Sequence, residues 1–261
     1  MRRAAMAERD SNKSSTALRA FHVLETVANS SEPLGVGEVA QLTGLDRATC
    51  YRMLRTIEQA GYVVRDPATK SFRPSRRIIS LARHLLVDDE TRMLVAQTLK
   101  QISKLTGETS HYSEIDGDSA VLTQRAKGTQ LVAVDFQIGE RYPLHTTSVG
   151  KAILANQSDS AIAAYLERPL TQLTSRTITD PVRLLDELQK VREAGISYDH
   201  CELAEGMNCV AIPVRGAQGK VVAGISISGP DSRFTDAKLH ELAMTIRVHA
   251  DALTRAFVGE T

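Results

Sequence analysis

Apolar side chains recur every three or four positions along the first sixty residues, which is the spacing of one face of an α-helix. The pattern predicts three helices, over about 15–29, 37–43 and 47–60. The residues that mark the first helix are Leu18, Phe21, Leu24 and Val27. Gly44 suits the C-terminal turn of the second helix and Gly61 the end of the third, and Asp46 is a good N-cap for the third.

Two short runs after the third helix predict a hairpin. Tyr62–Arg65 and Ser71–Arg73 favour strands, and the turn residues 66–70 separate them. Helix, helix, turn and helix followed by a hairpin is the winged helix-turn-helix arrangement. We therefore expect a winged helix-turn-helix domain over 15–75. We expect a flexible N-terminal tail at 1–14 before it, and a linker helix over 76–89 after it.

Strands and helices alternate through the rest of the chain, 90–261. The predicted strands lie near 109–115, 119–126, 130–136, 196–200, 207–214 and 220–228. The predicted helices lie near 90–106, 147–155, 158–167, 181–194 and 235–258. This order is typical of an α+β domain, and we expect its helices to pack against one side of the sheet.

The third predicted helix has two chemically different faces. Cys50, Leu54 and Ile57 form an apolar face. The opposite face and the helix start carry Arg47, Ala48, Thr49, Tyr51, Arg52 and Arg55. Arginines beside a small residue suit a helix that reads base edges and phosphates in the major groove. The wing residues expected to follow the DNA backbone are Arg65, Lys70 and Arg73. A solvated arginine face is the alternative explanation.

Charge supports the DNA interpretation only when it is counted by segment. The whole chain has a net charge of +1 and 42% hydrophobic residues, as ordinary globular proteins do. Residues 1–88 hold 14 Lys+Arg against 9 Asp+Glu, a net of +5, and 89–261 hold 18 against 22, a net of −4. This asymmetry indicates a polyanionic partner for the first segment.

The chain lacks the signals of export and membrane insertion. Its basic N-terminus is followed by no apolar run, and no stretch approaches the roughly 18 apolar residues of a membrane span. Three cysteines are too few and too odd in number for a disulfide framework. We expect a cytoplasmic protein with no membrane partner.

Several motifs resemble the IclR family of bacterial transcriptional regulators. In the first segment these are VGEVA at 36–40, TGL at 43–45, TCYRML at 49–54 and GYV at 61–63. The more specific motifs are GERYPLHTTSVGKAILA at 139–155, GMNCVAIPV at 206–214 and ISISGP at 225–230. The resemblance covers about 15–258. Pro74-Ser75 stand where the family usually has Leu-Gly.

The resemblance implies a DNA-binding domain joined by a linker helix to a GAF-like or profilin-like effector-binding domain over 90–261. It implies a one-component regulator, more often a repressor, that binds a palindromic operator in double-stranded DNA as a homodimer or a dimer of dimers. The implied effector is a small organic acid or aromatic catabolite. The implied effector-binding residues are Ser148, Val149, Asp199, Met207, Cys209, Ser226 and Ser228.

Helix N-terminal amides and hydroxyl groups bind a carboxylate without a buried cation, which agrees with that residue set. Ser226 and Ser228 are two apart on a predicted strand and therefore share a face. We predict no enzyme activity, cofactor, metal or catalytic residue. The alternative is a small-molecule-binding protein or enzyme whose winged helix serves protein contacts only.

Three other motif interpretations have weaker support. Gly150-Lys151 lack the phosphate-loop pattern, because His145 stands where a glycine is needed and Ala152 replaces the Mg²⁺-binding hydroxyl. Asp199, Cys201 and Cys209 are zinc-ligand types without paired ligand spacing. A catalytic pair of His145 with Cys201 or Cys209 has no activating group that the sequence reveals.

Overall fold

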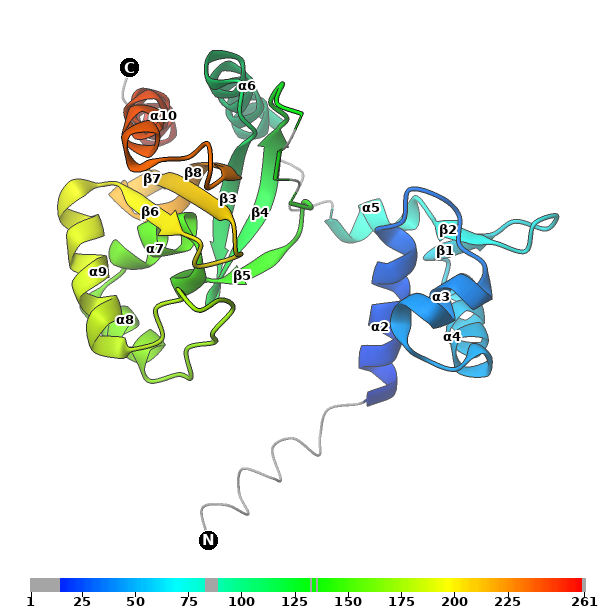
Figure 1. The fold of residues 1–261 in the computed structure, drawn as a ribbon. Coiled ribbons are helices and arrows are strands. Elements are labelled where there is room, and N and C mark those ends of the chain that lie inside the picture. The colour runs from blue at the N-terminus through cyan, green and yellow to red at the C-terminus, as the bar shows by residue number, and fades with distance from the viewer. Residues whose placement is uncertain (1–14, 83–88, 132, 135, 260–261) are drawn as a thin grey trace, which may run out of the picture. The chain divides into compact units, whose positions relative to one another are not determined.

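The computed structural model describes residues 15–82, 89–131, 133–134 and 136–259. The chain divides into two compact units, 1–88 and 89–261 (Figure 1). The tail predicted at 1–14 lies outside the described residues. Within the described part of the chain, no helix is long and apolar enough to cross a membrane.

The part of the first unit that the structure describes holds three helices and a two-stranded wing, followed by a fourth, short helix. The first three helices are α2 (Ser15–Ala28), α3 (Val36–Thr43) and α4 (Arg47–Gln59). Strand β1 (Val63–Arg65) pairs antiparallel with β2 (Phe72–Pro74). The core consists of Val23, Val27, Leu34, Val39, Cys50, Leu54, Ile57, Val63 and Phe72. The predicted cap is confirmed, since the Thr49 amide donates to Asp46 Oδ1 over 2.9 Å.

Helix α2 forms where it was predicted, but only the second half of its predicted apolar face, Leu24 and Val27, packs on the core. Leu18 and Phe21 are exposed, whereas Val23 and Val27 are buried. At 3.6 residues per turn, the nine positions that separate Val27 from Leu18 make two and a half turns. The two ends of a three-residue repeat therefore face opposite ways, and only one end can meet α3 and α4.

Pro74-Ser75 give the exit from the wing a defined geometry. The Ser75 hydroxyl donates to the Gly61 carbonyl and accepts from the Arg77 amide at 3.1 Å. The Arg77 guanidinium lies 5.3 Å from the centre of the Tyr62 ring, a cation–π distance. Helix α5 (Arg77–Ala82) starts there. Positions 83–88 of the predicted linker lie outside the described residues.

The second unit contains a six-stranded antiparallel sheet in the order β5-β4-β3-β8-β7-β6. The strands are β3 (Ser110–Asp116), β4 (Ser119–Ala126), β5 (Arg141–Pro143), β6 (Ser197–His200), β7 (Met207–Arg215) and β8 (Val221–Pro230). The strand predicted at 130–136 is wrong, because none of its described residues is a strand. The Phe136 carbonyl accepts from the Arg125 side chain instead, and β5 takes the edge beside β4.

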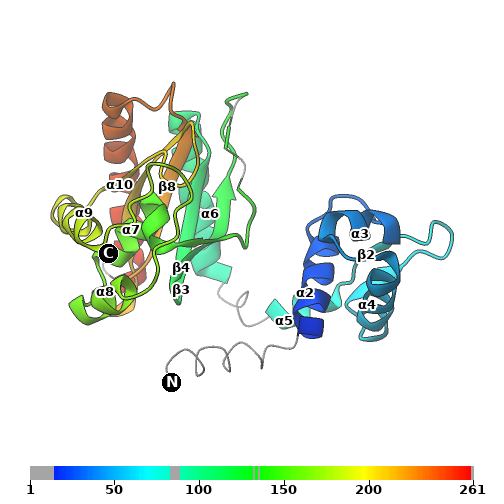
Figure 2. The same ribbon diagram turned by 60° about the horizontal axis from the view of Figure 1, so that its bottom comes forward.

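Helices cover both faces of this sheet, so the prediction of one covered side is wrong (Figures 1 and 2). Helices α6 (Asp89–Thr106) and α10 (Asp236–Val258) pack on one face, and α7 (Ser148–Ala155), α8 (Asp159–Leu166) and α9 (Pro181–Ala194) belong to a core on the other. Strand β8 alternates Ile225 and Ile227 on the α10 side with small polar residues on the α7 side. Polar residues normally mark a solvated face, whereas here they lie beneath a helix.

Candidate functional site

The outer face of α4 is exposed, as the sequence predicts. Arg47, Ala48, Tyr51, Arg52 and Arg55 are exposed, and Thr49 is half-buried. Neighbours on the same face orient two of the arginines. Arg52 Nη2 donates to Thr49 Oγ1 over 3.2 Å, and Arg55 Nη1 lies 2.6 Å from Glu58 Oε2. Both guanidinium groups keep donors for an external acceptor, since each carries five N–H groups.

The wing presents two of its three predicted cations. Lys70 and Arg73 are exposed, and Asp66 orders the turn by accepting from the amides of Ala68 (2.7 Å) and Thr69 (2.9 Å). Arg65 differs because it is half-buried, with its guanidinium 5.8 Å from the centre of the Phe72 ring. Arg65 therefore packs on the core of this unit as well as adding charge to the wing.

In the second unit, the start of α7 leaves two backbone donors outside the helix. Thr147 Oγ1 accepts from the Gly150 amide, and the Thr147 carbonyl accepts from the Lys151 amide, both at 2.9 Å. The first amides of a helix have no partner within it, so those of Ser148 and Val149 are left for a ligand or water. The positive end of the helix dipole reinforces their preference for an anion.

Strand pairing brings the predicted polar side chains together beneath α7. Asp199 on β6 pairs with Cys209 on β7, and Cys209 pairs with Ser228 on β8. Ser226 lies two residues further along β8, between Ala211 and His111. All four side chains therefore share one face of the sheet.

Five of the seven predicted effector residues line one small cavity, of about 30 Å³. Its lining is His111, Ser113, Ala120, Leu122, Phe136, Tyr142, Thr147, Ser148, Val149, Leu203, Cys209, Ser226 and Ser228. Asp199 and Met207 are not on this lining, although Asp199 neighbours Cys209 through the strand register. The volume is about that of one water molecule.

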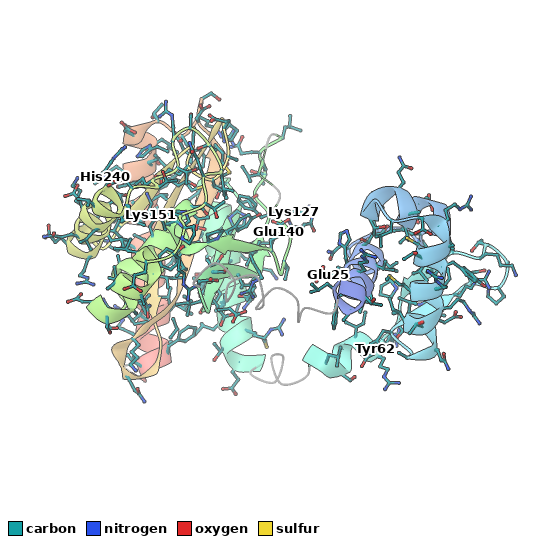
Figure 3. The ribbon with its side chains drawn as sticks, turned by 90° about the horizontal axis from the view of Figure 1, so that it is seen from below. Glu25, Tyr62, Lys127, Glu140, Lys151 and His240 are labelled. Carbon is teal, nitrogen blue, oxygen red and sulfur yellow. The ribbon has the colours of Figure 1, made fainter. Side chains whose placement is uncertain are left out.

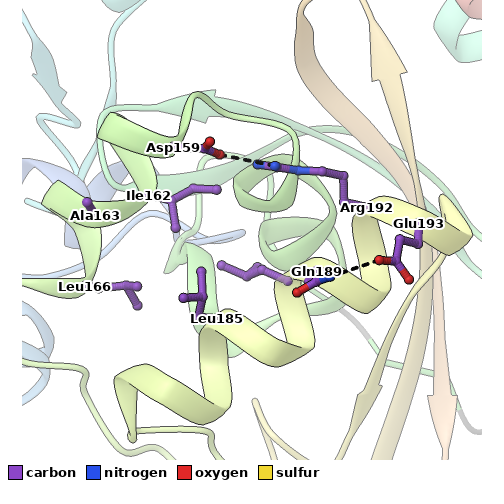
Figure 4. A pocket seen from close by; sticks show the side chains of 9 residues that line it. Asp159, Ile162, Ala163, Leu166, Leu185, Gln189, Arg192 and Glu193 are labelled. Carbon is purple, nitrogen blue, oxygen red and sulfur yellow. Dashed lines mark hydrogen bonds and ion pairs between the residues drawn. The ribbon is translucent and has the colours of Figure 1, made fainter.

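A larger hollow of about 520 Å³ lies between α8 and α9 (Figure 4). Its wall includes Ile162, Leu166 and Leu185, together with the ion pair of Asp159 and Arg192. It holds none of the residues that the sequence singled out. The smaller cavity is therefore the better candidate for a specific site.

Three aromatic residues of the cavity were missed by sequence reasoning. The rings of His111, Phe136 and Tyr142 form a row in space. The centre of the Phe136 ring lies 5.4 Å from that of His111 and 5.5 Å from that of Tyr142, and both pairs meet edge to face. They come from β3, from the segment after β4 and from β5, so no local spacing connects them. Burial raises the pKa of Tyr142, and its hydrogen bond to Glu140 raises it further.

A buried ion network lies behind the cavity. Lys151, labelled in Figure 3, is completely buried, and its Nζ donates to Glu202 at 2.7 Å and Glu187 at 2.9 Å. Burial lowers the pKa of Lys151, but the two carboxylates outweigh it and the pKa ends above its usual value. Burial raises the pKa of Glu202, and Lys151 opposes that shift. Sequence reasoning assigned no role to this pair.

Asp199 and Cys209 adjoin that network. Asp199 is fully buried, and its Oδ1 accepts from the Glu202 amide over 2.6 Å. Burial and the charge of Glu202 raise the pKa of Asp199 to about 7. Burial also raises the pKa of the Cys209 thiol, and Asp199 adds to the shift. Cys209 is therefore a neutral thiol at neutral pH, which does not suit a nucleophile.

His145 is held in a structural role beside the cavity. Its Nε2 lies 3.0 Å from the Thr171 carbonyl, which can only accept, so Nε2 carries the proton. Its Nδ1 then accepts from the Tyr165 hydroxyl at 2.7 Å. Burial lowers the pKa of His145 and favours this neutral tautomer.

The zinc-ligand types do not gather into a metal site. Cys201 Sγ contacts Asn208 Oδ1 at 3.4 Å. Over the residues that the structure describes, no three His, Cys, Asp or Glu side chains come close enough to hold a metal ion.

A winged helix with an exposed arginine face, joined in one chain to a domain whose cavity is lined in part by buried polar side chains, defines the class of DNA-binding regulators with a sensing domain. Family models agree. The model for the IclR helix-turn-helix domain matches 16–67, and the model for the bacterial transcriptional regulator IclR C-terminal domain matches 84–255. The chain belongs to the IclR family of bacterial transcriptional regulators.

Individual relatives cover nearly the whole chain. The HTH-type transcriptional regulator KdgR of Escherichia coli is 31% identical over 237 residues, 90% of each chain. The acetate operon repressor of Salmonella typhimurium is 30% identical over 92% of this chain and 89% of its own. The crystal structure of the Thermotoga maritima IclR is 30% identical, with a TM-score of 0.75 over 93% of this chain and 98% of that one.

Proposed function

We propose that this regulator is a repressor that binds a palindromic operator as a homodimer or a dimer of dimers, and that a small carboxylic acid, aliphatic or aromatic, changes its affinity for DNA. The observation that carries the proposal is the pairing of two surfaces in one chain. One is the basic outer face of α4, and the other is the cavity at the start of α7. A relative named as an operon repressor supports the direction of control.

The arginines of α4 have the chemistry for reading guanine. A guanidinium can donate two parallel bonds to guanine O6 and N7, and Arg52 and Arg55 are exposed one turn apart on the same face. The wing cations Lys70 and Arg73 suit phosphate contacts, which position the protein without reading sequence. Arg65 contributes less to such contacts because it packs on Phe72.

The cavity has hydrogen-bond donors for an acid, but in this structure it is too small to hold one. The amides of Ser148 and Val149 and the hydroxyls of Ser226 and Ser228 can bind a carboxylate. A space of about 30 Å³ cannot hold an organic acid, so binding has to enlarge it. A ligand that prefers the enlarged form shifts the protein toward it, and such couplings are typically worth about 1–3 kcal/mol.

Fluorescence anisotropy with the intergenic DNA beside the gene tests the DNA half of the proposal. We expect salt-sensitive, sequence-selective binding. Arg52→Ala should weaken it by about 1–3 kcal/mol and relax the preference at one base pair. The matched control is Arg183→Ala, an exposed arginine on α9 that should leave binding unchanged. Equal losses from both substitutions would refute the role of α4.

A thermal-shift screen of organic and aromatic acids tests the effector half, because a ligand that binds only the folded state raises its stability. Acids that raise the melting temperature are then added to the DNA complex. Ser226→Ala and Ser228→Ala should reduce both effects. An acid that stabilises both variants as well as it stabilises the original protein binds somewhere else.

A further inference from the structure

The walls of the effector cavity contain no lysine and no arginine. The nearest buried ammonium group is Lys151, and its Nζ already contacts the carboxylates of Glu202 and Glu187. An acid bound in this cavity would be held by amides, hydroxyl groups and the imidazole of His111. Negative charge behind the cavity would then repel the bound acid, because no lysine or arginine on the cavity wall offsets it.

Three carboxyl groups stand behind the cavity with one ammonium group: Asp199, Glu202 and Glu187 with Lys151. Of the three, Asp199 and Glu202 are buried, and Glu187 is partly exposed. Asp199 Oδ2 and Glu202 Oε2 are both buried and have no hydrogen-bond partner. An ionised carboxylate with an unpaired buried oxygen is unfavourable, and a bound proton removes most of that cost.

The contacts indicate which carboxyl group holds the proton. Glu202 accepts from the Lys151 ammonium at 2.7 Å, which stabilises its ionised form. Asp199 accepts from backbone amides, that of Glu202 on Oδ1 and that of Leu203, and no described cation donates a hydrogen bond to it. It is also the more deeply buried of the two and faces the negative charge of Glu202, and its pKa is raised to about 7.

We infer that Asp199 carries a proton in the ligand-free protein and that a carboxylate effector binds only while Asp199 keeps it, so that above neutral pH the acid is taken up together with one proton. The inference rests on the proposed carboxylate class of the effector. Cys209, the strand neighbour of Asp199, lines the cavity, so an acid bound there lies close to Asp199. Two adjacent negative charges would repel each other, and the proton prevents this.

Every element packed around Asp199 contributes a charged or titratable group. Helix α7 provides Lys151, the segment after β6 provides Glu202, β7 provides Cys209 and α9 provides Glu187. On the far wall of the cavity, β3 provides His111. Cys209 stays neutral and Lys151 stays charged, because the pKa of each is raised. Among the buried acidic groups of this cluster, Asp199 is therefore the one that changes charge near neutral pH.

The first experiment uses the full-length protein without ligand. Infrared spectroscopy at about pH 6 separates protonated carboxylic acids from carboxylates, and surface acids are already ionised there. We expect a protonated-acid band that Asp199→Asn removes and that fades as the pH is raised to about 8. Asp251→Asn, an exposed residue of α10, is the matched control and should keep the band. A band absent from the original protein, or retained in Asp199→Asn, would overturn the inference.

The second experiment titrates pyruvate and benzoate into both proteins by calorimetry at about pH 6 and about pH 8. Each pH unit above the pKa of Asp199 should cost the original protein about tenfold in affinity. Asp199→Asn should bind equally at both pH values. Equal affinity of the original protein at both would overturn the coupling. If no acid binds in this titration or in the thermal-shift screen, the proposal of a carboxylate effector is refuted. The infrared result still decides whether Asp199 holds a proton.

Discussion

Lys151 is a buried ammonium group, and its replacement should destabilise the second unit. Lys151→Met removes the partner of Glu202 and leaves its carboxylate buried and uncompensated. Breaking a buried pair in this way typically destabilises a protein by about 3–5 kcal/mol. Urea unfolding followed by circular dichroism measures the loss. The control is Lys190→Met, whose exposed pair with Asp186 should leave the midpoint unchanged, and equal midpoints for all three proteins would contradict the prediction.

Asp199 should make stability fall with rising pH. Its pKa is raised from 3.8 to about 7, so the folded protein holds this proton more tightly than the unfolded chain does. Between these values the unfolded state has already lost the proton, and stability falls by at most about 1.4 kcal/mol for each pH unit. Above about pH 7 both states are ionised and the loss is complete. Asp199→Asn should abolish this component in urea midpoints measured across the range, and a variant with the same slope as the original would refute it.

At the scale of single residues, local chemistry was predictable and long-range contacts were not. Asp46 as a cap and Ser226 with Ser228 on one face follow from spacing alone. The pairing of Lys151 with Glu202 joins residues 51 positions apart, and strand order and helix packing bring them together. His111 entered the cavity for the same reason, because β3 pairs with β8 although 115 residues separate His111 from Ser226.

The approach of α7 to the sheet depends on a glycine. A Cβ on Gly150 would lie 2.3 Å from the Leu144 carbonyl oxygen, a backbone atom that cannot rotate away. Gly150→Ala should therefore shift α7, destabilise the second unit by about 1–3 kcal/mol and weaken effector binding. Urea unfolding and the thermal-shift screen measure both effects. Unchanged stability with unchanged binding would show that α7 has room to move.

Gly37 in α3 is the matched control with the opposite expected sign. It lies within a helix, and the nearest atom to an added Cβ is 3.8 Å away, on the Arg47 side chain. Gly37→Ala should stabilise the first unit by about 0.5–1 kcal/mol, because alanine loses less conformational freedom than glycine on forming a helix. The urea midpoint of the first unit measures this, and a lower midpoint would contradict it.

At the scale of elements, helices with distinct ends were predictable and the edge of the sheet was not. Helix α9 was predicted to within a residue because Pro181 opens it and Gly195 closes it. The apolar run at 130–136 looked like a strand, yet β5 occupies the position beside β4. Which segment pairs with an edge depends on the partner strand, and local propensity carries no information about that.

The two units divide the charge of the whole molecule, and this division should appear in the salt dependence of DNA binding. Each phosphate that the protein neutralises adds about 0.9 to the slope of log affinity against log salt concentration. The first segment holds the net charge of +5 and the exposed wing cation Lys70. Lys70→Asn should therefore lower the slope by about one while leaving the base preference unchanged, because a phosphate contact carries no sequence information. Asparagine suits the position because Lys70 has a positive φ of 61°, a conformation that asparagine tolerates.

The control for that measurement is Lys220→Asn, which removes the same charge from the second segment, where the net charge is −4. Anisotropy titrations at several salt concentrations give the slope for each protein. If the second unit takes no part in phosphate binding, Lys220→Asn keeps the slope of the original protein. A slope lowered equally by both substitutions would mean that the second unit also contacts DNA. The charge difference between the two segments would then not separate the segment that reads DNA from the segment that senses the effector.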